Sequence, residues 1–458
     1  MTASDVVADR RRFLLEAPIV PAIARLAAPT TLVLLVQILA GIAETWFISF
    51  QGIGALAGAT LVFPCLMLMQ MVSNGGLGSG VSAAVAHAVG AGRRQDADAL
   101  VLAAVVLGAG IGLIFTLGQF LGGRALYQWM GGSGEALEAA MIYADLIFGA
   151  SIVIWIVNLL ASALRASGAP GVPARISVIA MVVTLPLSPA LIFGWGPLPA
   201  LGIAGAGIGL DVHYLLTLGM LIAHLRSNRA TLRLTFDFRR LTPALFRDIM
   251  RVGGFGAIGS VVPNLSVVII TATVGRFGAE ALAGYGMASR LDYLITPLLF
   301  GIGTGVMALV GTNLGAGQME RVRRITWIGG WAGAAVAGVI GVTAAIFPDA
   351  WLGLFSRDPA VIGTGTIYLH TVGLFYAVTG FSMLLGMAGQ GAGRAVWPLI
   401  GSLVRLGVGA VGGTILVAGF GMGLHALFVM IVIGGALSCL VMILSQRAAD
   451  ARAAQREA

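Results

Sequence analysis

The chain has 458 residues, of which 58% are hydrophobic and only 10% are charged, and its mean hydropathy is +0.97. Soluble domains carry about 25% charged residues, so this composition excludes a soluble globular protein and predicts a polytopic helical membrane protein. The net charge is +8, and all the basic residues are arginines. Because these arginines are unevenly distributed among the loops, we read them as membrane topology signals and expect no nucleic-acid partner.

The N-terminal segment 1–23 begins with polar residues and contains Arg10-Arg11-Arg12. The apolar run that follows lacks a small-residue cleavage pattern, so we expect a retained first helix and no signal peptide. Cys65 and Cys439 each lie inside an apolar run. We therefore expect both cysteines to be packing residues, and we expect neither a disulfide nor a metal site.

Twelve apolar runs are long enough to cross a membrane, which takes about 20 apolar residues in a helix. They cover residues 24–49, 56–86, 99–121, 139–163, 173–194, 203–225, 252–275, 281–312, 325–347, 361–388, 396–419 and 423–446. The sequence therefore predicts an all-α integral membrane protein with twelve transmembrane helices.

Arginine is distributed unevenly over the loops between these runs. With the N-terminus inside, 21 arginines fall on the inner side, whereas the outer loops hold only Arg124, Arg276 and Arg357. Basic residues collect in cytoplasmic loops. We therefore expect a multi-pass protein of the cell (inner) membrane with both termini in the cytoplasm.

The two halves of the chain repeat short patterns. Ala55-Leu-Ala-Gly58 recurs 226 residues later, and Gly78-Ser-Gly80 and Gly90-Ala-Gly92 recur 225 residues later as Gly303-Thr-Gly305 and Gly315-Ala-Gly317. Each half has six runs, an even number, so both halves enter the membrane from the same side. The pattern predicts two six-helix lobes related as parallel repeats, with the transport site between or within them.

These observations divide the chain into five parts. We expect an N-terminal cytoplasmic segment (1–23), a first lobe (24–225), a charged cytoplasmic linker (226–250), a second lobe (251–446) and a cytoplasmic tail (447–458). A short surface helix is expected in the linker around residues 243–249.

The first apolar run carries an acid where a charge is costly. Gln37, Gly41 and Glu44 are spaced by four and three residues, so a helix places them on one face. A charged side chain at the membrane centre costs about 2.5–3.5 kcal/mol on insertion scales and usually faces a polar cavity or pathway. The alternative is that Glu44 reaches the headgroups.

Three more acids lie in apolar runs: Asp145, Asp211 and Asp292. Asp145 lies near an outer end and is expected to reach interfacial water. Asp211 can complement Glu44 if the first and sixth spans face one cavity, whereas His213 points elsewhere and is expected in the core. Arg290 and Asp292 are two residues apart, so each needs a partner on another helix, either structural or for a ligand.

The chain resembles the MATE (multidrug and toxic compound extrusion) transporters over nearly its whole length. The motifs that carry this resemblance are the Gly-Ala-Gly turns at 90–92 and 315–317, Leu164-Arg-Ala-Ser-Gly168 and Leu191-Ile-Phe-Gly194. The resemblance implies a V-shaped pair of six-helix lobes that exports organic, often cationic, compounds in exchange for protons or sodium ions. Family members carry an acid late in the first helix, where Glu44 stands, and an asparagine where Asn158 stands.

Other family positions differ. Proton-linked members often have Asn-x-x-x-Asp in the fifth helix, where this chain has Thr184-Leu-Pro-Leu-Ser188. The acids of a second-lobe ion site are absent from the seventh and tenth runs. We expect Glu44, helped by Asp211 and Asn158, to carry a coupling proton. Sodium remains possible, because Thr184 and Ser188 could add oxygen ligands to the same set.

Other functions were weighed against this one. A lipid-linked oligosaccharide flippase of the wider superfamily would favour an arginine-lined cavity, but the spans hold few arginines. A channel suits the two-lobe repeat less well. An intramembrane enzyme would need clustered histidines or a nucleophile with its base, and the five histidines are scattered. We therefore expect a non-enzymatic, monomeric transporter without a cofactor, with small organic molecules and membrane lipids as partners.

Overall fold

The computed structural model describes residues 3–195, 199–227 and 230–457, and these residues form helices and connecting loops without a strand. The first half contains α1 (Ala3–Glu16), α2 (Ile19–Ser49), α3 (Ile53–Gln70), η1 (Met71–Leu77), α4 (Gly78–Gly90), α5 (Arg94–Trp129), α6 (Gly134–Gly149), α7 (Ser151–Ala166), α8 (Gly171–Phe193) and α9 (Ile203–Leu225). The second half contains η2 (Phe238–Arg240), α10 (Pro243–Gly275), α11 (Ala279–Gly315), α12 (Met319–Ile346), α13 (Pro348–Leu352), α14 (Pro359–Thr371), η3 (Gly373–Phe375), α15 (Tyr376–Gly391), α16 (Val396–Val404), η4 (Arg405–Gly412), α17 (Gly413–Phe420) and α18 (Leu424–Glu457).

The expected number of spans is confirmed. Within the described ranges, eleven helices are long and apolar enough to cross a membrane, and α6 with α7 forms a twelfth span bent by 50°. The bend falls between Gly149 and Ser151, small residues that commonly allow helix kinks. Two other spans contain a π-helical segment, η1 after α3 and η4 after α16.

One segment outside the predicted spans differs from expectation. The surface helix expected around residues 243–249 is instead the first part of α10, because Pro243 fits the first turn of a helix and the helix continues to Gly275. The polar N-terminal segment is helical from Ala3 to Glu16. Residues 228–229 of the expected linker lie outside the described residues.

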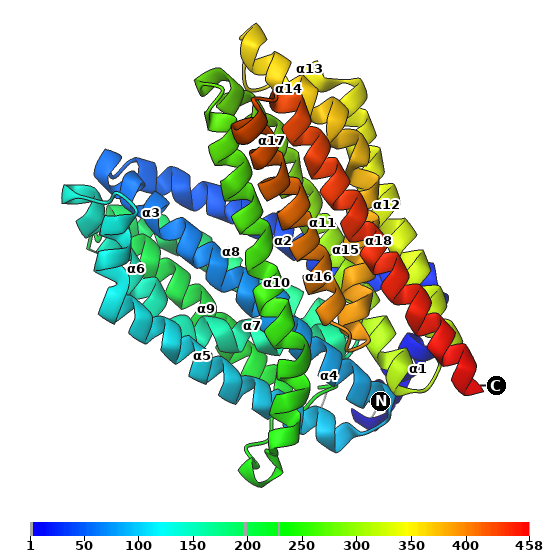
Figure 1. Cartoon of the computed structure of the whole chain (residues 1–458). Helices are drawn as coiled ribbons and strands as arrows, with labels where there is room; N and C mark the ends of the chain where they lie inside the picture. Colours follow the sequence, from blue (N-terminus) through cyan, green and yellow to red (C-terminus); the bar gives the residue numbers. More distant parts are fainter. Residues whose placement is uncertain (1–2, 196–198, 228–229, 458) are drawn as a thin grey trace.

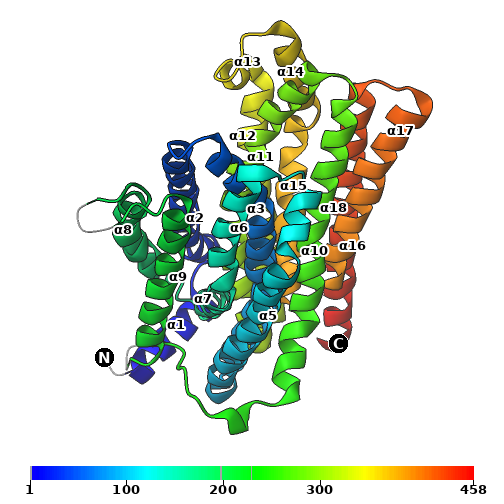
Figure 2. The ribbon, with the colours of Figure 1, turned by 90° about the vertical axis from the view of Figure 1, so that its left-hand side faces the viewer.

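The helices form two lobes, each with its own apolar core. The first core surrounds Trp155 and Tyr127, and the second surrounds Phe428 and Leu369; all four side chains are fully buried. Figure 1 shows the lobes diverging like the arms of a V from the end that carries both chain termini. In Figure 2 the linker runs from α9 to α10 at this same end, which we call the termini end.

Near the termini end, glycines allow the helices of the two lobes to pack closely. These glycines lie at equivalent positions of the two sequence repeats. A methyl group on Gly90 of α4 would overlap the carbonyl oxygen of Thr312 in α11. At the equivalent position 225 residues later, a methyl group on Gly315 would overlap the carbonyl oxygen of His87. Because small residues allow backbones to approach closely in membranes, the repeated glycines form a pseudo-twofold contact between α4 and α11.

Helix α1 bridges the two lobes at the termini end. The Arg11 guanidinium donates to the carbonyl oxygen of Gly90, with Nη2 at 2.8 Å, and Leu14 packs fully buried against Gly168 in the first lobe. From the second lobe, Asn313 Nδ2 donates to the carbonyl oxygen of Leu14 at 3.0 Å. Burial lowers the pKa of Arg10, and the charges of nearby arginines lower it further.

Candidate functional site

Glu44 lies on the first lobe in the half of α2 that points away from the termini end. Its Oε1 accepts a hydrogen bond from Tyr143 Oη of α6 at 3.5 Å. Tyr143 is 6% exposed, so packing fixes the phenol that meets the acid. The hydroxyl of Tyr143 also lies within electrostatic range of Asp211 on α9. Tyr143 thus connects two of the predicted site acids, which come from helices far apart in the sequence.

A chain of amides continues from this point across α3, η1 and α7. Asn158 Nδ2 donates to Gln70 Oε1 at 2.9 Å and to Ser73 Oγ at 2.8 Å. Gln70 Nε2 donates in turn to the hydroxyl of Tyr214, which interacts electrostatically with Glu44. Asn158 is therefore connected to the Glu44 region through Gln70 and does not contact the carboxylate by these bonds.

The chain reaches an arginine at the end of α7. Arg165 Nη2 donates to Ser162 Oγ at 2.7 Å and to Asn74 Oδ1 at 3.4 Å, and Asn74 Nδ2 donates to Gln70 Oε1 at 3.3 Å. Asn74 belongs to η1, so the π-helical segment supplies the central members of the chain. Such segments often occur at functional positions because they turn side chains out of the regular helical order.

The remaining predicted oxygen ligands point into other contacts. Thr184 Oγ1 donates to the carbonyl oxygen of Ala180 and lies 3.4 Å from His213 Nδ1. The Cβ of Ser188 faces Gly209 of α9. Gln37 Nε2 donates to Ser177 Oγ at 3.4 Å. These residues join α2, α8 and α9, and this conformation does not bring them together with Glu44 as one cage.

Asp211 and Asp145 have different surroundings. Asp211 is partly buried, and its Oδ1 is enclosed without a hydrogen-bond partner among the described residues. Asp145 Oδ1 accepts from Gln119 Nε2 at 2.9 Å, and Gln119 Oε1 accepts from Tyr127 Oη. Asp145 is therefore held within a packing contact between α5 and α6, while Asp211 keeps a free acceptor.

The second lobe contains a separate polar cavity of about 50 Å³. Asp292 of α11 faces it together with Tyr368, Tyr376 and Arg405, which come from α14, α15 and the start of η4. Asp292 Oδ2 accepts from Tyr368 Oη at 3.2 Å. Arg405 interacts electrostatically with the same carboxylate, so it is the counter-charge that the sequence alone did not pair with Asp292.

Arg290 lies outside this cavity. Its guanidinium carbon is 5.2 Å from the centre of the Phe355 ring, and the residue is exposed. Arg290 and Asp292 are two positions apart in the sequence, so they leave α11 on different faces. Arg290 lies over the ring of Phe355, whereas Asp292 lines the cavity with the two tyrosines and Arg405.

The sequence analysis did not single out several residues of these two clusters, among them Gln70, Asn74, Tyr143, Tyr214, Tyr368, Tyr376 and Arg405. Gln70 and Arg405 did carry a signal, because each is a strongly polar residue inside an apolar run. The tyrosines carried none, since tyrosine is ordinary in apolar helices and becomes informative only when its hydroxyl meets an acid.

Comparison with known proteins adds a family relationship. The model of the MatE family matches residues 29–190 and 257–415, one segment in each lobe. The chain is 25% identical over 408 residues to a FAD transporter of Shewanella oneidensis, covering 86% of this chain and 87% of that protein. It is 29% identical over 380 residues to a probable multidrug resistance protein NorM of Deinococcus radiodurans, covering 80% and 79%.

The fold also matches solved structures. One is described as the outward-facing conformation of a multidrug resistance MATE family transporter, with a TM-score of 0.87 at 24% identity over 96% of this chain and 98% of that one. At this identity the match establishes the two-lobe fold.

Proposed function

The chain belongs to the MATE family, and from this membership we propose that it is a secondary active exporter of small organic, often cationic compounds. In this proposal the lobes rock about their glycine contacts near the termini end, so that a site in the first lobe faces each side of the membrane in turn. Exchange for a proton supplies the driving force. The transporter works as a monomer and needs no cofactor.

The observation that carries the proposal is the acidic character of the first-lobe site. The Glu44 carboxylate accepts a hydrogen bond from the Tyr143 hydroxyl, and one carboxylate oxygen of Asp211 has no hydrogen-bond partner among the described residues. No ion pair joins either acid to an arginine among the described residues. Acids that lack a fixed counter-charge in an apolar environment can exchange a proton for an organic cation. A flippase for anionic lipid-linked sugars would need the opposite charge here.

The positions of the oxygen ligands favour a proton over sodium as the coupling ion. Sodium needs several oxygens directed at one point, whereas Thr184 Oγ1 donates to the Ala180 carbonyl oxygen and lies against His213. A proton needs one carboxylate and a neighbouring hydrogen-bond donor, which Glu44 and Tyr143 provide. Release of the proton then frees Glu44 to attract a cationic substrate, and binding of a new proton displaces it.

The orientation follows from the arginine bias, with the termini end in the cytoplasm of an inner-membrane protein. The V then opens to the outside, which is the state from which an exporter releases its substrate.

The test is an efflux assay in vesicles with proton and sodium gradients imposed separately. We expect the proton gradient alone to drive export of an organic cation. Glu44→Gln keeps the size and hydrogen bonding of the side chain, so the protein should fold normally and lose uphill export. Asp145→Asn is the matched control, since that carboxylate belongs to a packing contact. Uphill export by Glu44→Gln with an unchanged pH profile would refute the proposal.

A further inference from the structure

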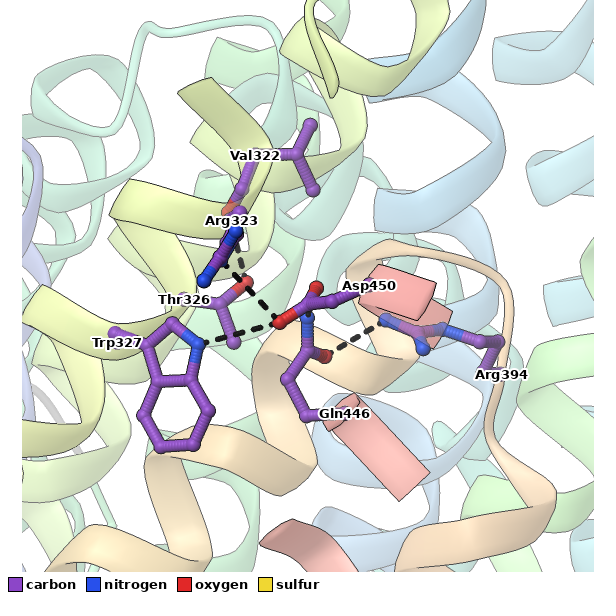
Figure 3. A network of polar contacts seen from close by, with 7 residues as sticks. All are labelled: Val322, Arg323, Thr326, Trp327, Arg394, Gln446 and Asp450. Carbon is purple, nitrogen blue, oxygen red and sulfur yellow. Dashed lines mark hydrogen bonds and ion pairs between the residues drawn. The ribbon is translucent and has the colours of Figure 1, made fainter. Parts of the chain in front are cut away.

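A polar network that plays no part in the proposed transport steps lies at the termini end of the second lobe (Figure 3). Arg323 and Trp327 come from the start of α12, Gln446 and Asp450 come from the end of α18, and Arg394 lies in the turn between α15 and α16. The network therefore connects three separate parts of the lobe.

Asp450 is the centre of this network. Its Oδ1 accepts from Gln446 Nε2 at 2.8 Å, and Gln446 Oε1 accepts from Arg394 Nη2 at 2.8 Å. Its Oδ2 accepts from Trp327 Nε1 at 3.4 Å and lies 3.6 Å from Arg323 Nε. Asp450 is 17% exposed, whereas Arg323 is 66% exposed. The partly buried acid thus contacts both an exposed guanidinium and an indole.

Three residues of the network, Arg323, Trp327 and Asp450, line a cavity of about 410 Å³ together with Arg447 and Ala451. This volume lies in the range of small-molecule sites, about 300–1,000 Å³. Two arginines and one aspartate give the lining a net positive charge. The cavity therefore suits an anionic group larger than an ion.

Apolar side chains continue from the cavity towards the middle of the spans. Phe381 of α15 packs against both Trp327 and Trp331 of α12, with ring centroids 6.1 and 5.0 Å apart. Trp331 is 66% exposed and Leu444 of α18 is 55% exposed. Trp331 lies one helical turn beyond Trp327, and Leu444 about one turn beyond Arg447. The basic cavity and the exposed apolar side chains thus follow each other along the same two helices.

We propose that this surface binds an anionic phospholipid from the leaflet at the termini end. The phosphodiester lies between Arg323 and Arg447, because guanidinium groups pair with phosphate oxygens through parallel hydrogen bonds. The acyl chains lie along Trp331 and Leu444. Trp327 sits at the level where tryptophan concentrates in membrane proteins, between headgroups and hydrocarbon.

The same chemistry could attract free phosphate, but two features favour the lipid. The Asp450 carboxylate in the lining repels a small, doubly charged anion more than it repels a singly charged phosphodiester. The exposed side chains of Trp331 and Leu444 offer nothing to inorganic phosphate, whereas they provide apolar contact for acyl chains. Basic pockets between transmembrane helices bind lipid headgroups in this way.

The experiment uses the full chain in nanodiscs that contain brominated phosphatidylglycerol or brominated phosphatidylcholine, with quenching of tryptophan fluorescence as the signal. We expect stronger quenching by the anionic lipid, and Trp327→Phe should remove part of this difference. Arg323→Gln and Arg447→Gln should each reduce the lipid preference by roughly five-fold, since one basic residue near the surface contributes about 1 kcal/mol. Arg124→Gln, which removes an exposed arginine of α5, should leave it unchanged.

Equal quenching by the two lipids, or an equal loss in Arg124→Gln, overturns the proposal. Displacement of the lipid signal by inorganic phosphate would instead assign the cavity to a free anion. Thermal midpoints of the variants show whether they fold. If Arg323→Gln or Arg447→Gln is unfolded, native mass spectrometry of the unmodified protein decides, because retained phosphatidylglycerol supports the site and its absence contradicts it.

Discussion

At the scale of single residues, one acid in each lobe receives a hydrogen bond from a tyrosine. Tyr143 donates to Glu44 at 3.5 Å, and Tyr368 donates to Asp292 at 3.2 Å. Neither acid forms an ion pair with an arginine within the described residues, but the charge of Arg405 acts on Asp292 and no arginine acts in this way on Glu44. We therefore expect a cationic substrate or a proton to meet less competition at Glu44.

Asp211 should support Glu44 in coupling. Asp211→Asn keeps the shape of the side chain and removes its charge, so the variant should fold normally. We expect weaker proton-driven export or a shifted pH dependence, because one of the two charges near Tyr143 is lost. Transport rates in vesicles measured across a pH series provide the check. A pH profile equal to that of the unmodified protein would assign Asp211 to packing alone.

Asp292 and Arg405 should behave as a pair. If the acid is structural, Asp292→Asn should lower the amount of folded protein in the membrane, and adding Arg405→Met should restore part of it. Residues that share a cavity, as these two do, typically show coupling energies of roughly 0.5–3 kcal/mol in double-mutant cycles. Fluorescence-detected size exclusion measures the folded fraction. Normal folding of Asp292→Asn with loss of transport would instead place a cation or proton at this acid.

At the scale of helices, the repeated glycines of α4 and α11 determine how closely the lobes approach. Gly90 and Gly315 occupy equivalent positions in the two repeats and face Thr312 and His87. Helix α1 covers this contact through Arg11 and Leu14. The termini end is thus closed both by direct helix packing and by an additional helix that must move when the lobes separate there.

Replacing either glycine should loosen this end. Gly90→Ala and Gly315→Ala each force a methyl group into a carbonyl of the other lobe, and overpacking typically costs about 1–3 kcal/mol. We expect lower thermal midpoints for both variants by similar amounts, because the two contacts are related by the repeat. Gly110→Ala in α5, where no atom lies within 4 Å of the added methyl, is the matched control. A normal midpoint in both variants would mean that α4 and α11 do not meet this closely.

At the scale of the whole molecule, both termini and the linker lie at the same end of the V. From the arginine bias we propose that this end lies in the cytoplasm. Tags inserted at 49–54 and 419–423 should therefore react with impermeant reagents from outside, and tags at 233–240 only after the membrane is opened. Accessibility of the 233–240 tag in intact cells would reverse the orientation and, with it, the direction of the proposed export.

The sequence by itself determined the spans, their number and the internal repeat. Hydropathy is a property of consecutive residues, and insertion in the membrane depends on it directly. The predicted run 203–225 therefore coincides with α9, and the predicted run 24–49 ends at the same residue as α2, which begins earlier, at Ile19. The internal repeat was also visible in the sequence. The close contact between α4 and α11 requires a glycine at the equivalent position of each half, as at Gly90 and Gly315.

Only the tertiary structure decided which polar side chains meet. The hydrogen bond from Tyr143 to Glu44, the pairing of Asp292 with Arg405 and the stacking of Arg290 on Phe355 depend on how each helix is rotated about its axis. That rotation results from packing against neighbours that are distant in the sequence. Hydropathy does not contain this information, because a helix rotated about its axis keeps the same composition and the same length in the membrane.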